Sequence, residues 1–257
     1  MARARKVKIV PPSGVVIYDG PSLIDGSPIV CIATLHSSNG KTGDMIQTWI
    51  MRADIDPLAA SRSGGDRAIC GDCGSRGTAT NGKRGVARNR KCYVLLQNAP
   101  LGIWKCYRRG GYPVAAGHAA IADVARGRKV RIGAYGDGAA MPSYIVDSLL
   151  SECAGHTAYS HQSGNAASSF DRAIYMVSAD SRAEAEAAWQ QGRRTFRVVR
   201  DLSEMVVGKE APCPSLVGRH CIDCLLCDGS DGAHGNAKSI VIPAHGAGAK
   251  YFEGETA

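Results

Sequence analysis

The chain has 257 residues, of which 44% are hydrophobic and 21% charged, which is ordinary for a soluble globular protein with a full core. No stretch approaches the roughly 20 apolar residues of a membrane span, and the basic N-terminus runs into prolines instead of a signal-peptide core. We therefore expect a cytoplasmic protein (host cytoplasm if phage-encoded) with reduced thiols and no membrane partner.

The net charge of +8 comes largely from clusters of basic residues at 3–8, 83–91, 126–131 and 193–200. Such clusters favour a polyanionic partner, and of the nucleic acids we expect DNA more than RNA. A solvated basic surface without a partner is the alternative. The candidate phosphate-binding residues are Arg84, Arg88, Arg90, Arg126, Arg128 and Lys129.

In chain order, residues 1–12 resemble a flexible basic arm, and residues 13–257 are expected to form one domain. Short β-rich runs at 15–18 and 29–34 are separated by turn signals at 19–21 and 25–26, and residues 45–51 suit a third strand. Residues 54–106 then form a cysteine-rich loop region.

This loop region contains a first group of cysteines, Cys70-Gly-Asp-Cys73 and Cys92, with Cys106 as a possible fourth member. Three thiolates at this spacing suit a zinc ion or an iron–sulfur cluster. A redox-active Cys-x-x-Cys pair or inert core thiols are the alternatives.

From residue 128 the sequence alternates regularly between strand and helix patterns. Strands are predicted at 129–135, 157–160, 173–178, 195–199 and 239–244, and helices at 142–153 and 183–191. Alternation with short connections predicts an α/β fold with a parallel sheet, as a (β/α) barrel or an incomplete TIM barrel with cysteine-rich metal-binding insertions.

Ionisable residues follow the predicted strands of this region, at Asp137, His161, Asp180, Asp201 and His245. Reactive side chains in parallel α/β folds lie at this end of the strands. For Asp180, which precedes a capping-box signature, a helix-capping role is the better interpretation. Asp137 lies between two glycines that allow close approach of a ligand, so both a cap and a reactive group are considered.

The densest motif is near the C-terminal end, within the segment 211–246. Cys213, Cys221, Cys224 and Cys227 fall within fifteen residues, and His245 follows eighteen residues later. Cys-x-x-Cys-x-x-Cys folds its thiolates around one centre, so we expect a structural zinc with four protein ligands, or an iron–sulfur cluster. Disulfides or idle thiols are the weaker alternatives.

Three blocks carry a resemblance to known proteins: residues 69–94, residues 131–137 and the closing Cys/His array. They resemble a family of uncharacterised proteins from bacterial phages and mobile elements. The closing array more distantly resembles the zinc site of tRNA-guanine transglycosylases and of phage relatives that place 7-deazaguanine bases in DNA. The resemblance implies a TIM barrel, a zinc held by Cys221, Cys224, Cys227 and His245, and Asp137 as catalytic carboxylate.

The leading hypothesis is therefore an enzyme that exchanges guanine for a 7-deazaguanine base, with that base as cosubstrate. Asp137 would attack C1′ of the nucleoside, and Asp19, His161 or Asp201 would act as acid and base. The alternatives are an iron–sulfur protein with redox or radical chemistry, and a non-enzymatic zinc protein that binds nucleic acid.

Overall fold

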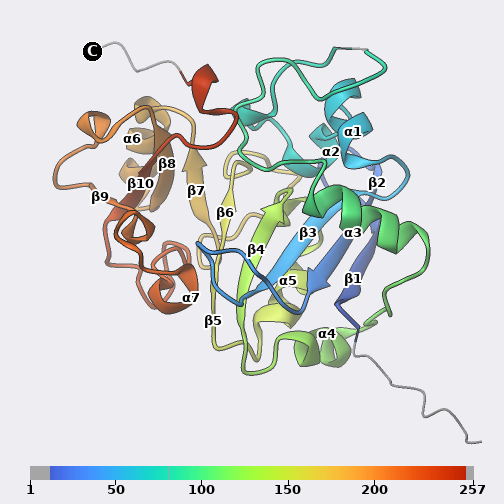
Figure 1. The fold of residues 1–257 in the computed structure, drawn as a ribbon. Helices are drawn as coiled ribbons and strands as arrows, with labels where there is room; N and C mark the ends of the chain where they lie inside the picture. The colour runs from blue at the N-terminus through green and yellow to red at the C-terminus, as the bar shows by residue number, and fades with distance from the viewer. Residues whose placement is uncertain (1–11, 81, 253–257) are drawn as a thin grey trace, which may run out of the picture.

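The structure is a computed structural model that describes residues 12–80 and 82–252. Its strands form two five-stranded sheets, which lie side by side in Figure 1. The first contains, in spatial order, β1 (Gly14–Pro21), β2 (Pro28–Thr34), β3 (Ile46–Arg52), β4 (Lys129–Tyr135) and β5 (Gly155–Thr157). The second contains β6 (Tyr159–Ser160), β7 (Met176–Ala179), β8 (Thr195–Val199), β10 (Ser239–Pro243) and β9 (Glu210–Pro212).

The first sheet begins as an antiparallel meander and continues as a parallel sheet. β1 pairs with β2, and β2 with β3, in antiparallel register, and the β1–β2 turn passes through Gly26 at a φ of 75°. β3, β4 and β5 then run parallel to one another. β2 is buried on both faces over most of its length, which explains its continuous apolar sequence.

The second sheet is wholly parallel, and one residue separates it from the first. Ala158 lies between β5 and β6, and its N–H donates to the Cys227 carbonyl at 2.8 Å. The pairs β6–β7, β7–β8, β8–β10 and β10–β9 are all parallel. The carboxyl ends of these strands therefore lie along one edge, where open α/β sheets bind ligands.

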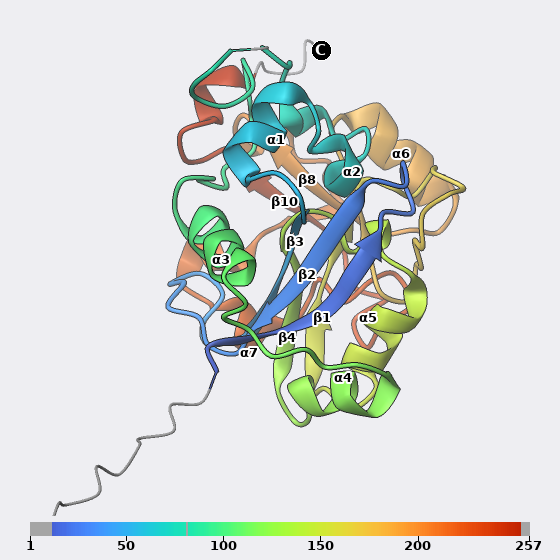
Figure 2. The ribbon, with the colours of Figure 1, turned by 90° about the vertical axis from the view of Figure 1, so that its right-hand side faces the viewer.

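The helices are α1 (Pro57–Ser63), α2 (Arg67–Cys70), α3 (Ala99–Arg108), α4 (His118–Ala125), α5 (Ser143–Leu150), α6 (Arg182–Gln190) and α7 (Cys221–Cys224). Local capping explains where several begin. The Asp56 carboxylate accepts N–H groups of the first turn of α1, and the Ser181 hydroxyl accepts the Glu184 N–H of α6. In Figure 2, α3 and the α4–α5 pair lie on opposite sides of the first sheet. None of the helices in the described segments combines the length and apolar character needed to cross a bilayer.

The main hydrophobic core surrounds the first sheet, and a smaller cluster lies in the second. The smaller cluster joins Met176, Cys227 and Ile240. Beside it, the Arg197 guanidinium pairs with the Glu210 carboxylate at 2.8 Å, with side chains only 1% and 0% exposed. The second sheet is therefore held together by a buried ion pair as well as by apolar contacts.

The α/β class is confirmed, and the predicted strands at 129–135 and 195–199 match β4 and β8. The barrel is not found: across residues 12–80 and 82–252 the strands form two open sheets, because β1–β3 are antiparallel and the predicted strand at 157–160 divides at Ala158. The region 54–106, expected as loops, contains α1, α2 and α3. The predicted basic arm falls almost entirely outside the described residues.

Candidate functional site

A cavity of about 240 Å³ opens beside the parallel strands. Its wall comes from β4, β6, β7, β8 and β10 and from the segments that carry the first cysteine group. Asp137, His161, Asp180 and His245, which sequence reasoning placed at strand ends, all line it. The parallel topology therefore brings these distant positions together as expected.

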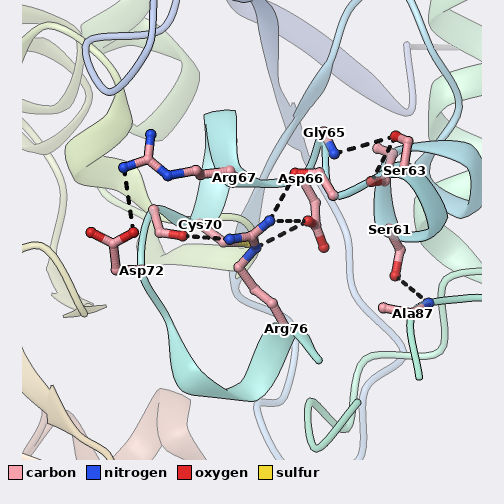
Figure 3. A network of polar contacts seen from close by, with 12 residues as sticks. Ser61, Ser63, Gly65, Asp66, Arg67, Cys70, Asp72, Arg76 and Ala87 are labelled. Carbon is pink, nitrogen blue, oxygen red and sulfur yellow. Dashed lines mark hydrogen bonds and ion pairs between the residues drawn. The ribbon is translucent and has the colours of Figure 1, made fainter. Parts of the chain in front are cut away.

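The loop after α2 is anchored by Arg76. Its guanidinium donates to Asp66 Oδ1 at 2.6 Å and to the Gly71 carbonyl at 2.8 Å (Figure 3). Gly71 has a φ of 55°, and a Cβ there would lie 2.2 Å from Gln162 Oε1, so a side chain does not fit. The path of this Cys-x-x-Cys loop is thus fixed from both sides.

Three cysteines meet at this loop and line the cavity: Cys70, Cys73 and Cys92. The Cys73 N–H donates to the Cys70 carbonyl at 3.3 Å, and the Cys92 N–H donates to the Ser75 carbonyl at 3.0 Å. Burial, and then the nearby Asp66 and the other two thiols, raise the pKa of Cys70 well above its usual value. Burial also raises the pKa of Cys92, against the opposing charge of Arg90.

Cys106 does not belong to this group. It lies in α3, where its carbonyl accepts the Gly111 N–H at 3.0 Å, and it is not among the described residues that line the cavity. The side chain that accompanies the three thiols in the cavity wall is instead His161, whose pKa is raised by the neighbouring Cys73 and Asp180 against the effect of burial.

His161 is held from two sides. Its ring Nε2 lies 3.2 Å from Asp180 Oδ1, and its backbone N–H donates to Asp137 Oδ2 at 2.9 Å. Burial alone would lower the pKa of His161, but Cys73 and Asp180 outweigh it and raise this pKa well above its usual value. His161 therefore joins β6, β7 and the cysteine loop in one polar network.

The C-terminal cysteines also form one group. Cys213 follows β9, Cys221 and Cys224 bound the short helix α7, and Cys227 is buried beneath them. Burial raises the pKa of Cys227 to about 12; the other three thiols add to this rise and a hydrogen bond with Tyr159 opposes it. Cys213 and Cys227 share the small hydrophobic cluster of the second sheet.

His245 lines the same cavity as Cys213 and Cys221, but its ring has other partners. Its ring lies against Tyr93, with centroids 5.2 Å apart, and its Nδ1 is 3.0 Å from the Pro243 carbonyl. The arrangement therefore favours Cys213 over His245 as the fourth member of the C-terminal set, a choice that the sequence left open.

All ten cysteines are free thiols. As the side chains lie, the described part of the chain contains no group of three His, Cys, Asp or Glu residues already arranged to hold a metal ion. The structure thus gathers the predicted ligands into two neighbourhoods, and metal binding stays a prediction.

Asp137 is a buried carboxylate whose oxygens are both occupied. Oδ1 accepts the Ala139 N–H at 3.0 Å, and Oδ2 accepts the Ser160 hydroxyl at 3.0 Å as well as the His161 N–H. Burial raises the pKa of Asp137, while these hydrogen bonds stabilise the carboxylate and oppose the rise. Asp137 lines the cavity, and its hydrogen bonds connect the end of β4 to β6.

The other two acid–base candidates lie elsewhere. Asp19 accepts the Tyr107 hydroxyl at 2.8 Å, and Asp201 caps a short 3-10 turn by accepting the Ser203 N–H at 2.8 Å. Neither side chain is among the described residues that line the cavity. The strand-end argument therefore fails for Asp201, because its carboxylate is used by the local turn.

The six predicted phosphate-binding residues do not form one surface. Arg90 lines the cavity, and Arg84 and Arg88 are exposed on the same loop. Arg126 pairs with Asp123 and Glu152, Arg128 donates to the Leu35 carbonyl, and Lys129 donates to the Ile222 carbonyl. These three precede or begin β4, none of them lines the cavity, and each uses its side chain in a contact with a neighbouring segment.

Two cavity residues were missed by sequence reasoning. Arg131 Nε and the Tyr135 hydroxyl are buried and have no hydrogen-bond partner among the described residues. Both residues belong to β4 and line the cavity. Gly133, between them, has a φ of 73°, and the β3–β4 register shifts there, so a simple strand alternation in the sequence does not identify them.

Fold and site together define an α/β protein whose two cysteine groups border one cavity. Neither a protein-family model, nor a curated protein, nor a solved structure matches the chain. The cavity is therefore the main source of evidence for the function.

Proposed function

We propose that the protein is a metalloenzyme that binds a nucleotide unit of a nucleic acid in this cavity and modifies its base. The observation that carries the proposal is the pair of buried, unpartnered donors, Arg131 Nε and the Tyr135 hydroxyl. Buried donors without a partner cost roughly 1–3 kcal/mol each, so a native protein keeps them where a ligand supplies the acceptor.

The rest of the lining suits a planar, anionic ligand. Arg90, Lys91 and Arg131 supply positive charge, and the rings of Tyr159 and Phe196 lie against each other with centroids 4.4 Å apart. Arginine side chains recognise phosphate groups, and aromatic rings stack on nucleobases at about 1–3 kcal/mol per base. Both features support a nucleotide more than an uncharged or aliphatic substrate.

The thiols of Cys213, Cys221, Cys224 and Cys227 would hold a zinc ion or an iron–sulfur cluster, for which four cysteines are a standard ligand set. A zinc centre there would stabilise the fold, and a cluster would supply electrons. Burial raises the pKa of Cys221, and the charge of Arg131 opposes this rise, so Arg131 lies between this group and the cavity. Cys221 itself lines the cavity.

Exchange of the base through Asp137 is a second candidate mechanism. Its support is that Asp137 and His161 line the same cavity. The three hydrogen bonds that Asp137 accepts favour a positioning role, so we rank this candidate below chemistry at a cysteine-bound centre.

The test is the binding of guanosine monophosphate and of a short single-stranded DNA oligonucleotide to the full chain. Tyr135→Phe removes only the unpartnered hydroxyl, so the free energy of unfolding should stay the same or rise. Affinity should fall about tenfold, equivalent to about 1.4 kcal/mol. Arg131→Ala should weaken binding further, and Arg126→Ala, on the far side of β4, is the matched control.

Unchanged affinity in both Tyr135→Phe and Arg131→Ala would reject the cavity as the binding site. If the wild type binds neither guanosine monophosphate nor the oligonucleotide, a nucleotide is not the substrate.

A further inference from the structure

The first cysteine group and His161 together carry an inference about a second metal site. It goes beyond the proposed function and does not depend on a nucleotide entering the cavity. Two segments far apart in the sequence supply the donors. Cys70, Cys73 and Cys92 come from the end of α2 and the loops that follow it, and His161 comes directly after β6.

The backbone holds the three thiols as one unit. The Cys73 N–H donates to the Cys70 carbonyl, and the Cys92 N–H donates to the Ser75 carbonyl at 3.0 Å. Gln162, next to His161, donates from Nε2 to the Cys70 carbonyl at 3.0 Å. The imidazole and the Cys-x-x-Cys loop are therefore fixed to each other by hydrogen bonds that do not involve a thiol.

Asp180 gives the strongest indication of what this group does. One carboxylate oxygen, Oδ1, lies 3.2 Å from His161 Nε2, and the other accepts the Gly74 N–H at 2.9 Å. A histidine that binds a metal usually donates its second ring N–H to a carboxylate, which fixes the ring and raises its basicity. Asp180 holds both the histidine and the cysteine loop in this way.

We propose that Cys70, Cys73, Cys92 and His161 are the four ligands of a second metal site, with Asp180 as the carboxylate that orients His161. Three thiolates and one imidazole suit a zinc ion or an iron–sulfur cluster. The side chains have to turn toward a common centre when the metal binds, because they do not yet converge. A nucleophilic Cys73 paired with His161 is the alternative, but it leaves the adjacent Cys70 and Cys92 without a role.

The test is metal analysis of the full chain after anaerobic purification, with reconstitution by Co²⁺ alone. Wild-type protein should bind metal at both cysteine groups, with thiolate-to-cobalt charge-transfer absorption. Cys92→Ser and His161→Ala should each lose the metal of the first group and keep that of the second. Cys224→Ser should do the reverse.

Two further variants keep the test informative if those proteins fold poorly. Asp180→Asn should fold and bind the first metal roughly 10–100-fold more weakly, as loss of a carboxylate partner does in other metal sites. Cys106→Ser, which changes the possible fourth cysteine of the sequence, should bind metal like the wild type.

Full metal content at the first group in His161→Ala would overturn the inference. So would metal-free wild-type protein in which iodoacetamide modifies Cys73 alone and only when His161 is present. Neither result bears on nucleotide binding by Arg131 and Tyr135, so failure of this inference and failure of the proposed function are distinguishable.

Discussion

Asp137 shows how much of a site residue's role is decided by its immediate hydrogen bonds. The sequence places it between two glycines after a strand, which suits a reactive carboxylate and a cap equally well. In the fold it accepts one side-chain and two backbone donors and is 6% exposed. The partners that decide its role are Ser160, in β6, and His161, directly after β6, and both are more than 20 residues away in the sequence.

Asp137→Asn should destabilise the protein. One oxygen becomes an NH₂ group, and either orientation of the amide places a donor against another donor, Ala139 N–H on one side or Ser160 and His161 on the other. We expect the free energy of unfolding to fall by about 1–3 kcal/mol, measured by denaturant titration. Asp19→Asn, at an exposed carboxylate, is the control and should change it by less than about 0.5 kcal/mol.

Wild-type stability in Asp137→Asn, together with complete loss of base exchange, would favour the nucleophile instead. That result would promote base exchange from second candidate to first.

At the scale of elements, the second sheet depends on a pair that sequence reasoning did not identify. Arg197 points from β8 to Glu210 of β9, and both side chains are essentially inaccessible. β9 is only three residues long and has no clear strand pattern. Neither this strand nor the ion pair that its Glu210 makes was therefore predicted. α3 was also not predicted, although Ile103, Trp104 and Tyr107 lie at helical spacing and pack against the main core.

Arg197→Met should lower the free energy of unfolding by about 3–5 kcal/mol, because it leaves the Glu210 carboxylate buried without its main partner. The double variant Arg197→Met with Glu210→Leu should recover most of this loss, since it removes both charges. Thermal or denaturant unfolding of the three proteins measures the difference. A double variant less stable than Arg197→Met alone would show that the pair is not the source of the effect.

At the scale of the whole molecule, the sequence predicted the parallel strands but not their assembly. Regular alternation after residue 128 indicates a parallel sheet, yet it does not state whether the sheet closes. Closure fails here because the first sheet starts with antiparallel strands and the chain changes sheets at Ala158. Long-range pairing of this kind leaves little trace in local periodicity.

The two cysteine groups were also predicted only in part from local sequence. Their spacing predicted which residues would gather, since short Cys-x-x-Cys segments determine local geometry. The place of His161 beside the first group depends on strand order, which the spacing of the cysteines does not encode.

We propose that a metal centre and a nucleotide share one cavity. The most direct measurement is the visible spectrum of the Co²⁺-substituted wild-type protein during titration with guanosine monophosphate. We predict that the cobalt bands shift with a saturable dependence on nucleotide, and that the shift is lost in Arg131→Ala. Bands that stay unchanged while the nucleotide binds would contradict a shared cavity.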